Sequence, residues 1–234
     1  MINQFKAENI RLKKRKGIAI TALVLFLINL FGAYSQFPRF FETMTVNEAL
    51  AETIGDTSLF FIVALCVTWF VGAEFSERTV QNELKLGYSR LSVVFVRFIY
   101  SCFIASAIHL LSITAIIAGA FMRYGFSLTE LNGADFLWLF IVLVQVCALQ
   151  GFTVLFVFLI RKAAAAMAVS AIFTLITCNL CRNFIKAPVY VYSCFSLAQD
   201  NEPKTLWVSF IFALAVLFIV PSVTYLVFRK ADME

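Results

Sequence analysis

The chain contains 234 residues, of which 62% are hydrophobic and only 14% are charged, and its net charge is +5. A soluble domain is typically about 45–50% apolar and about 25% charged, so a water-soluble core of this length cannot hide this much apolar surface. The composition excludes an ordinary soluble globular protein. It predicts an all-α membrane protein, because helices satisfy their own backbone hydrogen bonds in lipid.

Six segments are apolar and long enough to cross the hydrocarbon core, which needs roughly 20 residues. They are expected to be transmembrane helices at approximately 17–37, 58–75, 90–122, 134–160, 163–180 and 206–228. A polar segment, 1–16, precedes them, and the longest outer connection is 181–205. No domain boundary is visible, so we expect residues 1–234 to form a single transmembrane domain. No small-residue cleavage site follows the first apolar run, which we therefore expect to be retained.

The distribution of lysine and arginine predicts the orientation of the spans. With a cytoplasmic N-terminus, 14 of the 19 Lys and Arg residues fall in inner segments. The positive-inside rule then places both termini in the cytosol and the segment 181–205 outside the cell. The positive charge is thus a topology signal rather than a nucleic-acid-binding patch. We expect a multi-pass protein of the cell membrane.

The first segment, residues 1–16, places Ile2, Phe5 and Leu12 among several cations. This pattern is compatible with an amphipathic helix lying along the inner leaflet.

The connection at residues 76–88, between the second and third spans, is the most polar stretch of the chain. Ser76 is a good N-cap residue, and Glu77 is well placed at the positive end of a helix dipole. Gly87 suits the C′ position that ends a helix, and Ser89 can cap the next span. The sequence predicts a short helix here, with apolar residues only at Val80, Leu84 and Leu86. A simpler interpretation is that these charges only anchor two helix ends in the headgroup region, with Arg97 snorkelling.

The stretch GAEFSERTVQNELKLGYSRLSVVFVRF resembles the cytoplasmic coupling segment of the ABC-2-type permease family of ABC transporters. In that family an acidic residue ends the second span, and a Thr-bearing short helix and a Gly-x-Ser-Arg turn follow. The matching residues are Glu74, Thr79, Asn82, Leu84, Gly87, Ser89 and Arg90. The opening FKAENIRLKKRKG is also similar. Arg78 and Arg97 depart from the family pattern, which often has Gly and Lys at these positions.

The resemblance implies a bacterial exporter subunit that pairs with an identical or homologous permease subunit and with two ABC ATPase subunits. The short helix would sit in a groove of the ATPase and convert its closure into movement of the spans. The implied ATPase-coupling residues are Glu74, Glu77, Arg78, Thr79, Asn82, Glu83, Lys85, Gly87, Tyr88, Ser89 and Arg90. ATP and Mg would bind the partner, since none of the nine glycines here heads a phosphate loop. We therefore expect no cofactor and no enzyme activity in this chain.

Small residues in the fifth span indicate close helix packing. Ala164 with Ala168 and Ala166 with Ser170 are spaced four residues apart, which suits either packing within the bundle or a subunit interface. The resemblance places the second and fifth spans near a central cavity. The pathway residues it suggests are Phe60, Phe61, Trp69, Phe173, Thr174 and Thr177.

The remaining polar candidates carry weaker signals. His109 lies inside the third span, where a proton relay would need a carboxylate partner, and a hydrogen bond to a neighbouring helix is the simpler role. Cys178 and Cys181 have no second cysteine pair to complete a metal site. Cys181 and Cys194 could pair on an oxidising outer side, which spacing alone leaves open.

Taken with the resemblance, the sequence predicts the permease subunit of an ATP-driven exporter of an amphipathic or antimicrobial peptide or a drug, for export or self-immunity. Two other classes are a stand-alone secondary transporter and a non-transporting membrane anchor or sensor. The first is disfavoured by the scarcity of carboxylates inside the spans and of Gly- or Pro-broken spans. The second leaves the capped inner helix without a role.

Overall fold

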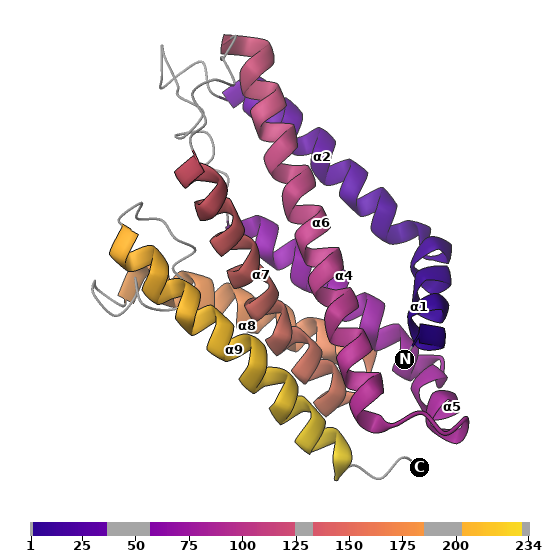
Figure 1. Cartoon of the computed structure of the whole chain (residues 1–234). Coiled ribbons are helices and arrows are strands. Elements are labelled where there is room, and N and C mark those ends of the chain that lie inside the picture. Colours follow the sequence, from indigo (N-terminus) through magenta and orange to yellow (C-terminus); the bar gives the residue numbers. More distant parts are fainter. Residues whose placement is uncertain (1, 37–56, 125–132, 185–202, 231–234) are drawn as a thin grey trace.

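A computed structural model describes residues 2–36, 57–124, 133–184 and 203–230, and within these ranges the fold is entirely helical (Figure 1). The predictions for the outer segments 37–56 and 185–202 lie outside the described residues. Cys194, which was considered as a disulfide partner of Cys181, is in the second of these segments. The helices are α1 (Ile2–Lys14), α2 (Lys16–Gln36), α4 (Thr57–Ser76), α5 (Thr79–Lys85), α6 (Arg90–Tyr124), α7 (Gly133–Ile160), α8 (Ala163–Phe184) and α9 (Pro203–Arg229).

Four of these helices are long and apolar enough to span a membrane by themselves. Their apolar windows are Leu59–Ser76, Arg90–Gly119, Phe136–Ile160 and Phe210–Arg229. A fifth candidate is the pair formed by α1 and α2, which bends by 59° between Lys14 and Lys16. The described apolar part of α8, Ala163–Thr177, is shorter than a full span. The structure thus confirms an all-helical fold with four or five helices long and apolar enough to cross a membrane, as in a multi-pass protein, and the six expected spans stay a prediction.

Three central helices, α4, α6 and α7, contact one another and form the core of the bundle. Each also packs extensively against one outer helix: α4 against α8, α6 against α2, and α7 against α9 (Figure 1). At one such contact the helices are very close, since a Cβ on Gly72 would lie 3.0 Å from the Cα of Ala163. The apolar side chains buried between these helices are the residues that the long hydrophobic runs supply.

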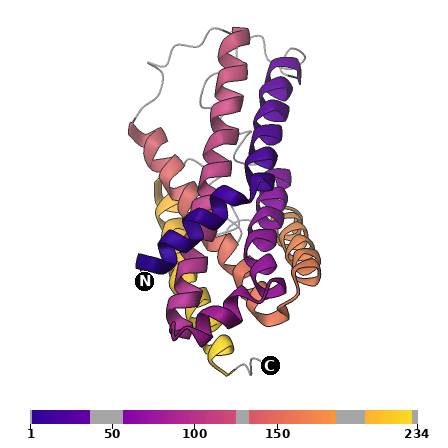
Figure 2. The same ribbon diagram turned by 90° about the vertical axis from the view of Figure 1, so that its right-hand side faces the viewer.

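α1, α5 and the C-terminal end of α9 lie at the same end of the bundle (Figure 1). Figure 2 shows α1 lying obliquely across α6 at this end. Two of the apolar residues that suggested an inner-leaflet helix, Phe5 and Leu12, are partly buried against the bundle, whereas Ile10 of α1 is 56% exposed. Phe5 lies beside Tyr100 of α6, with ring centroids 6.0 Å apart, and Leu12 packs against the core. The reason is that α1 also carries polar side chains whose partners lie in the bundle.

Candidate functional site

The short helix α5 joins α4 to α6 with defined ends. The prediction that Ser76 caps it is wrong, because α4 continues through Ser76, whose hydroxyl donates to its own helix at the carbonyl of Gly72. The chain then turns at Arg78, which has a left-handed backbone (φ 55°), and α5 begins at Thr79. The two charged residues Glu77 and Arg78 therefore lie in the turn between α4 and α5.

The predicted end of α5 is confirmed. Gly87 has φ +87°, a conformation that glycine adopts at little cost. Its N–H donates to the carbonyl of Leu84 (3.0 Å), and the N–H of Tyr88 donates to the carbonyl of Glu83 (3.2 Å). This is the Schellman arrangement, which satisfies the last carbonyls of a helix. Ser89 caps α6 as predicted, its hydroxyl accepting from the N–H of Ser92 at 3.2 Å.

α5 presents two different faces. Val80 and Glu83 are buried, and Leu84 packs against the core. On the other side Asn82 and Lys85 are exposed, and Leu86, just beyond the last turn, is 77% exposed. The helix is therefore fixed on one side and open on the other.

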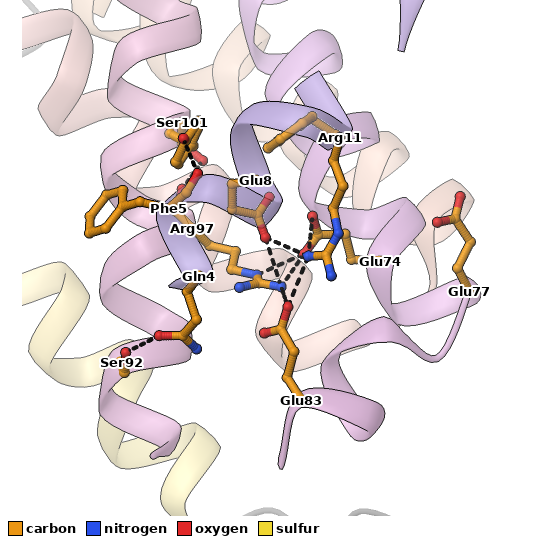
Figure 3. A network of polar contacts seen from close by, with 12 residues as sticks. Gln4, Phe5, Glu8, Arg11, Glu74, Glu77, Glu83, Ser92, Arg97 and Ser101 are labelled. Atoms are coloured by element: carbon orange, nitrogen blue, oxygen red, sulfur yellow. Dashed lines mark hydrogen bonds and ion pairs between the residues drawn. The ribbon is translucent and has the colours of Figure 1, made fainter. Parts of the chain in front are cut away.

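The buried side of α5 is held by a cluster of ion pairs centred on Arg97 of α6 (Figure 3). The Arg97 guanidinium donates to Glu74 at the end of α4 (2.7 Å) and to Glu83 of α5 (2.9 Å). It also lies 3.1 Å from Glu8 of α1. We call Glu8, Arg11, Glu74, Glu83 and Arg97 the ion cluster. One arginine thereby connects α1, α4, α5 and α6.

Arg11 closes the ion cluster from the α1 side. Its Nη1 donates to Glu8 at 2.5 Å and to Glu83 at 2.9 Å, and it lies 3.7 Å from Glu74. Burial opposes the charge of Arg11, but the carboxylates of Glu8, Glu83 and Glu74 outweigh it and raise the pKa of Arg11 above its ordinary value. Arg11 is the more accessible of the two arginines, with 27% of its side chain exposed against 0% for Arg97.

Further hydrogen bonds attach α1 to the bundle. Ser92 of α6 donates to the side-chain oxygen of Gln4, and the Tyr100 hydroxyl donates to the carbonyl of Phe5 (2.8 Å). At the other end of α1, Arg15 donates to the carbonyl of Phe70 at the C-terminal part of α4 and lies 3.4 Å from Glu77. α1 is thus attached along its whole length.

The start of α6 is tied to the end of α9. Arg90 donates to the carbonyls of Phe228 (2.7 Å) and Arg229 (2.8 Å), and its guanidinium lies 5.5 Å from the centroid of the Phe228 ring. A cationic side chain at the last carbonyls of a helix donates hydrogen bonds to them and interacts favourably with the negative end of the helix dipole.

The residues predicted for ATPase coupling divide into two groups. Glu74 and Glu83 are buried in the ion cluster, and Thr79, Tyr88 and Arg90 are partly buried. The exposed members are Glu77, Arg78, Asn82, Lys85, Gly87 and Ser89. Only this second group lies open at the surface for direct contact with another protein. Their coupling role stays a prediction.

The predicted pathway residues do not form one lined surface. Phe60 is fully buried beside His109, with ring centroids 4.8 Å apart, and Thr174 is also buried. Phe173 packs between Phe152 and Phe156 of α7. The others lie at different degrees of exposure: Phe61 and Thr177 are partly buried, and Trp69 is 37% exposed. Their role in transport stays a prediction.

The two pairs of small residues in α8 lie on different faces. Ala166 and Ser170 are fully buried inside the bundle, whereas Ala164 and Ala168 are exposed. The first pair therefore serves packing within the chain, and only the second is open to another subunit.

Among the described residues no group of three or more His, Cys, Asp or Glu side chains is arranged to hold a metal ion. Cys66, Cys102 and Cys147 are free thiols, and Cys147 lies 3.4 Å from the hydroxyl of Ser106. The side chains of Cys178 and Cys181 lie outside the described part.

Glu8, Arg11, Leu86 and Arg97 were not among the predicted site residues, and Arg97 is fully buried in the ion cluster instead of snorkelling to the surface. A signal for the first two is present in the sequence. Gln4, Glu8, Arg11 and Arg15 follow one another at spacings of three or four residues, which places them on one face of a helix. A helix face with polar residues of both positive and negative charge fits a buried polar contact as well as it fits a solvated surface.

Comparison with known protein families, curated proteins and solved structures finds no match to this chain. The functional interpretation therefore depends on the geometry described above.

Proposed function

We propose that this chain is the permease subunit of an ATP-driven ABC exporter of the ABC-2 type, moving its substrate outward with energy from a separate ATPase subunit. The observation that carries the proposal is α5, a short helix with one exposed polar face, mounted between two membrane-spanning helices. In this proposal the exposed residues Asn82, Lys85 and Leu86 contact the ATPase, and Leu86 supplies an apolar side chain for a groove in the partner.

The ion cluster supports this role because it prevents α5 from moving alone. Breaking a buried ion pair by removing one partner costs about 3–5 kcal/mol. Arg97 holds Glu83 of α5, Glu74 of α4 and Glu8 of α1 at once. A force applied to α5 would therefore displace α1, α4 and α6 together, which is a rigid-body mode of switching.

The proposal includes six spans with both termini in the cytosol of a bacterial cell, α2 and α8 serving as the first and fifth spans. The assembly would contain two ATPase subunits, which bind ATP and Mg, and a second permease subunit. Its cargo would be an amphipathic or antimicrobial peptide or a drug. The exposed Ala164 and Ala168 offer a close-packing face for the second permease.

The coupling assignment is tested with the triple variant Asn82→Ala, Lys85→Ala, Leu86→Ala. We expect a loss of at least about tenfold in affinity for the ATPase, which corresponds to about 1.4 kcal/mol, while the isolated chain keeps its thermal stability. The proposal predicts that a phosphate-loop ATPase is encoded beside this chain, and this ATPase is co-expressed and co-purified with it. The matched control is Lys6→Ala, Lys13→Ala, Lys14→Ala on the exposed side of α1. Equal binding by both triple variants would contradict the assignment.

The orientation is tested by labelling. In a cysteine-free background, a Lys85→Cys chain should react with a membrane-impermeant maleimide only after the cells are opened. Labelling in intact cells would place α5 outside and refute the proposed function.

A further inference from the structure

The charges of the ion cluster do not balance. It contains three carboxyl groups (Glu8, Glu74 and Glu83) and two guanidinium groups (Arg11 and Arg97), so full ionisation leaves one surplus negative charge (Figure 3). The other titratable groups nearby do not correct this. Tyr100 is neutral and donates to a backbone carbonyl, and Arg15 is directed to Phe70 and the exposed Glu77.

The surplus charge would be buried. Glu8 and Glu74 have 0% of their surface exposed, and Glu83 has 5%. An uncompensated charge in such a place is costly, and a carboxyl group there becomes neutral by taking up a proton. Burial and the charge count thus both indicate a bound proton.

The geometry shows where this proton would lie. Glu8 and Glu74 are the two fully buried carboxyl groups of the ion cluster, and both contact Arg97 Nη2, at 3.1 and 2.7 Å. Glu8 Oε2 and Glu74 Oε1 are buried without a hydrogen-bond partner among the described residues, and Arg11 lies 3.7 Å from Glu74 Oε1. Glu83 Oε2 also has no partner, but Glu83 keeps 5% of its surface exposed and its Oε1 accepts from both arginines. Two carboxylate oxygens cannot hydrogen-bond to each other without a proton between them.

We propose that Glu8 and Glu74 form a proton-binding pair, which holds one proton between α1 and α4 in the folded chain at neutral pH. The proton comes from water and returns to it, one carboxylate becoming a carboxyl group when it is bound, and it belongs to the pair rather than to either residue. Its loss at alkaline pH places two adjacent negative charges on α1 and α4, so α1 is held less firmly as the pH rises. The proposal rests on the ion cluster alone and requires no ATPase partner.

The test uses infrared spectra of the full chain in lipid nanodiscs, where a protonated carboxyl group gives a C=O band separate from those of carboxylates. We expect a band at pH 7 that disappears at alkaline pH. Because Gln is close to Glu in shape but cannot hold the shared proton as an acid, Glu74→Gln and Glu8→Gln should each remove one protonated carboxyl per chain. The control is Glu77→Gln. Glu77 is exposed and lies in the turn directly after α4, so this variant should leave the band unchanged.

A wild-type chain with no protonated carboxyl at pH 7, or a band that keeps its full size in both Glu8→Gln and Glu74→Gln, would overturn the proposal. A second measurement does not depend on band assignment. Amide hydrogen exchange in α1, corrected for the intrinsic effect of pH, should become faster at alkaline pH in the wild type but not in Glu74→Gln. The same pH profile in both chains would also overturn it, and circular dichroism confirms that each variant keeps its helical content.

Discussion

Replacement of Arg97 by Met should be the most destabilising single change at the end of the bundle that carries α5. Met keeps much of the volume of the arginine stem but removes the guanidinium that contacts Glu74, Glu83 and Glu8 at 2.7, 2.9 and 3.1 Å. Arg11 alone then faces three buried carboxyl groups. Removing one partner from a buried ion pair costs about 3–5 kcal/mol, and we expect a loss of this size, partly offset where a carboxyl group takes up a proton.

The assay is thermal unfolding of the purified chain in detergent, followed by circular dichroism. Lys85→Met is the control, since Lys85 is exposed on α5 and surface substitutions usually change stability by less than about 0.5 kcal/mol. Adding Glu74→Gln to Arg97→Met should restore part of the loss, because it removes a carboxylate left without its main partner. The reasoning would be refuted if Arg97→Met and Lys85→Met unfolded at the same temperature, or if the second substitution made the chain less stable still.

Three further substitutions test local contacts. Gly87→Ala should lower the free energy of unfolding by roughly 1–2 kcal/mol and accelerate amide exchange in α5, because φ is +87° at this position. The control is Gly32→Ala, which lies in a helix with no heavy atom within 4 Å of the added Cβ and should be neutral or slightly stabilising. Gly72→Ala should cost roughly 1–3 kcal/mol in thermal unfolding, because its Cβ would meet the Ala163 backbone at 3.0 Å; Gly151→Ala, which meets only side chains at 3.4 Å, is the milder comparison. Arg90→Met should lower the free energy of unfolding by about 1–3 kcal/mol, since two carbonyls of α9 lose their donor. The end of α9 should also become more sensitive to protease than in the control Arg229→Met, which changes an exposed residue. Equal cleavage in both variants would contradict the capping role of Arg90.

The helices of the bundle were predictable because their signal is local. Long apolar runs give helices at all six expected places, and Gly87 and Ser89 end and begin helices where their backbone and hydroxyl chemistry favours it. The start of α5 was less predictable. Ser76 can cap a new helix or continue the old one, and here its hydroxyl donates within α4 to the carbonyl of Gly72.

The ion cluster joins residues that are far apart in the sequence, so local patterns could not reveal it. Glu8 and Glu83 are separated by 75 positions, and each is an ordinary acidic residue in a polar segment. Their burial depends on how α1 folds back across α6, which the 59° bend before α2 makes geometrically accessible. The same folding explains why Phe5 and Leu12 face the bundle and not the lipid. The polar partners of α1 lie in the bundle, and Phe5 and Leu12 pack there as well, whereas Ile10 is exposed.

The two proposals together predict that coupling weakens at alkaline pH. Loss of the proton shared by Glu8 and Glu74 would set like charges against each other, loosen α1, and weaken the contact of Arg11 with Glu83 of α5. Movement of α5 would then be transmitted less completely to the spans. The measurement is the amount of cargo moved per ATP hydrolysed by the reconstituted complex across a pH series. We expect this ratio to fall at alkaline pH in the wild type and to stay constant in Glu74→Gln, with hydrolysis by the isolated ATPase as the control. A parallel fall in both chains would show that the pH effect lies outside the ion cluster, because Gln at position 74 cannot lose the proton that the mechanism requires.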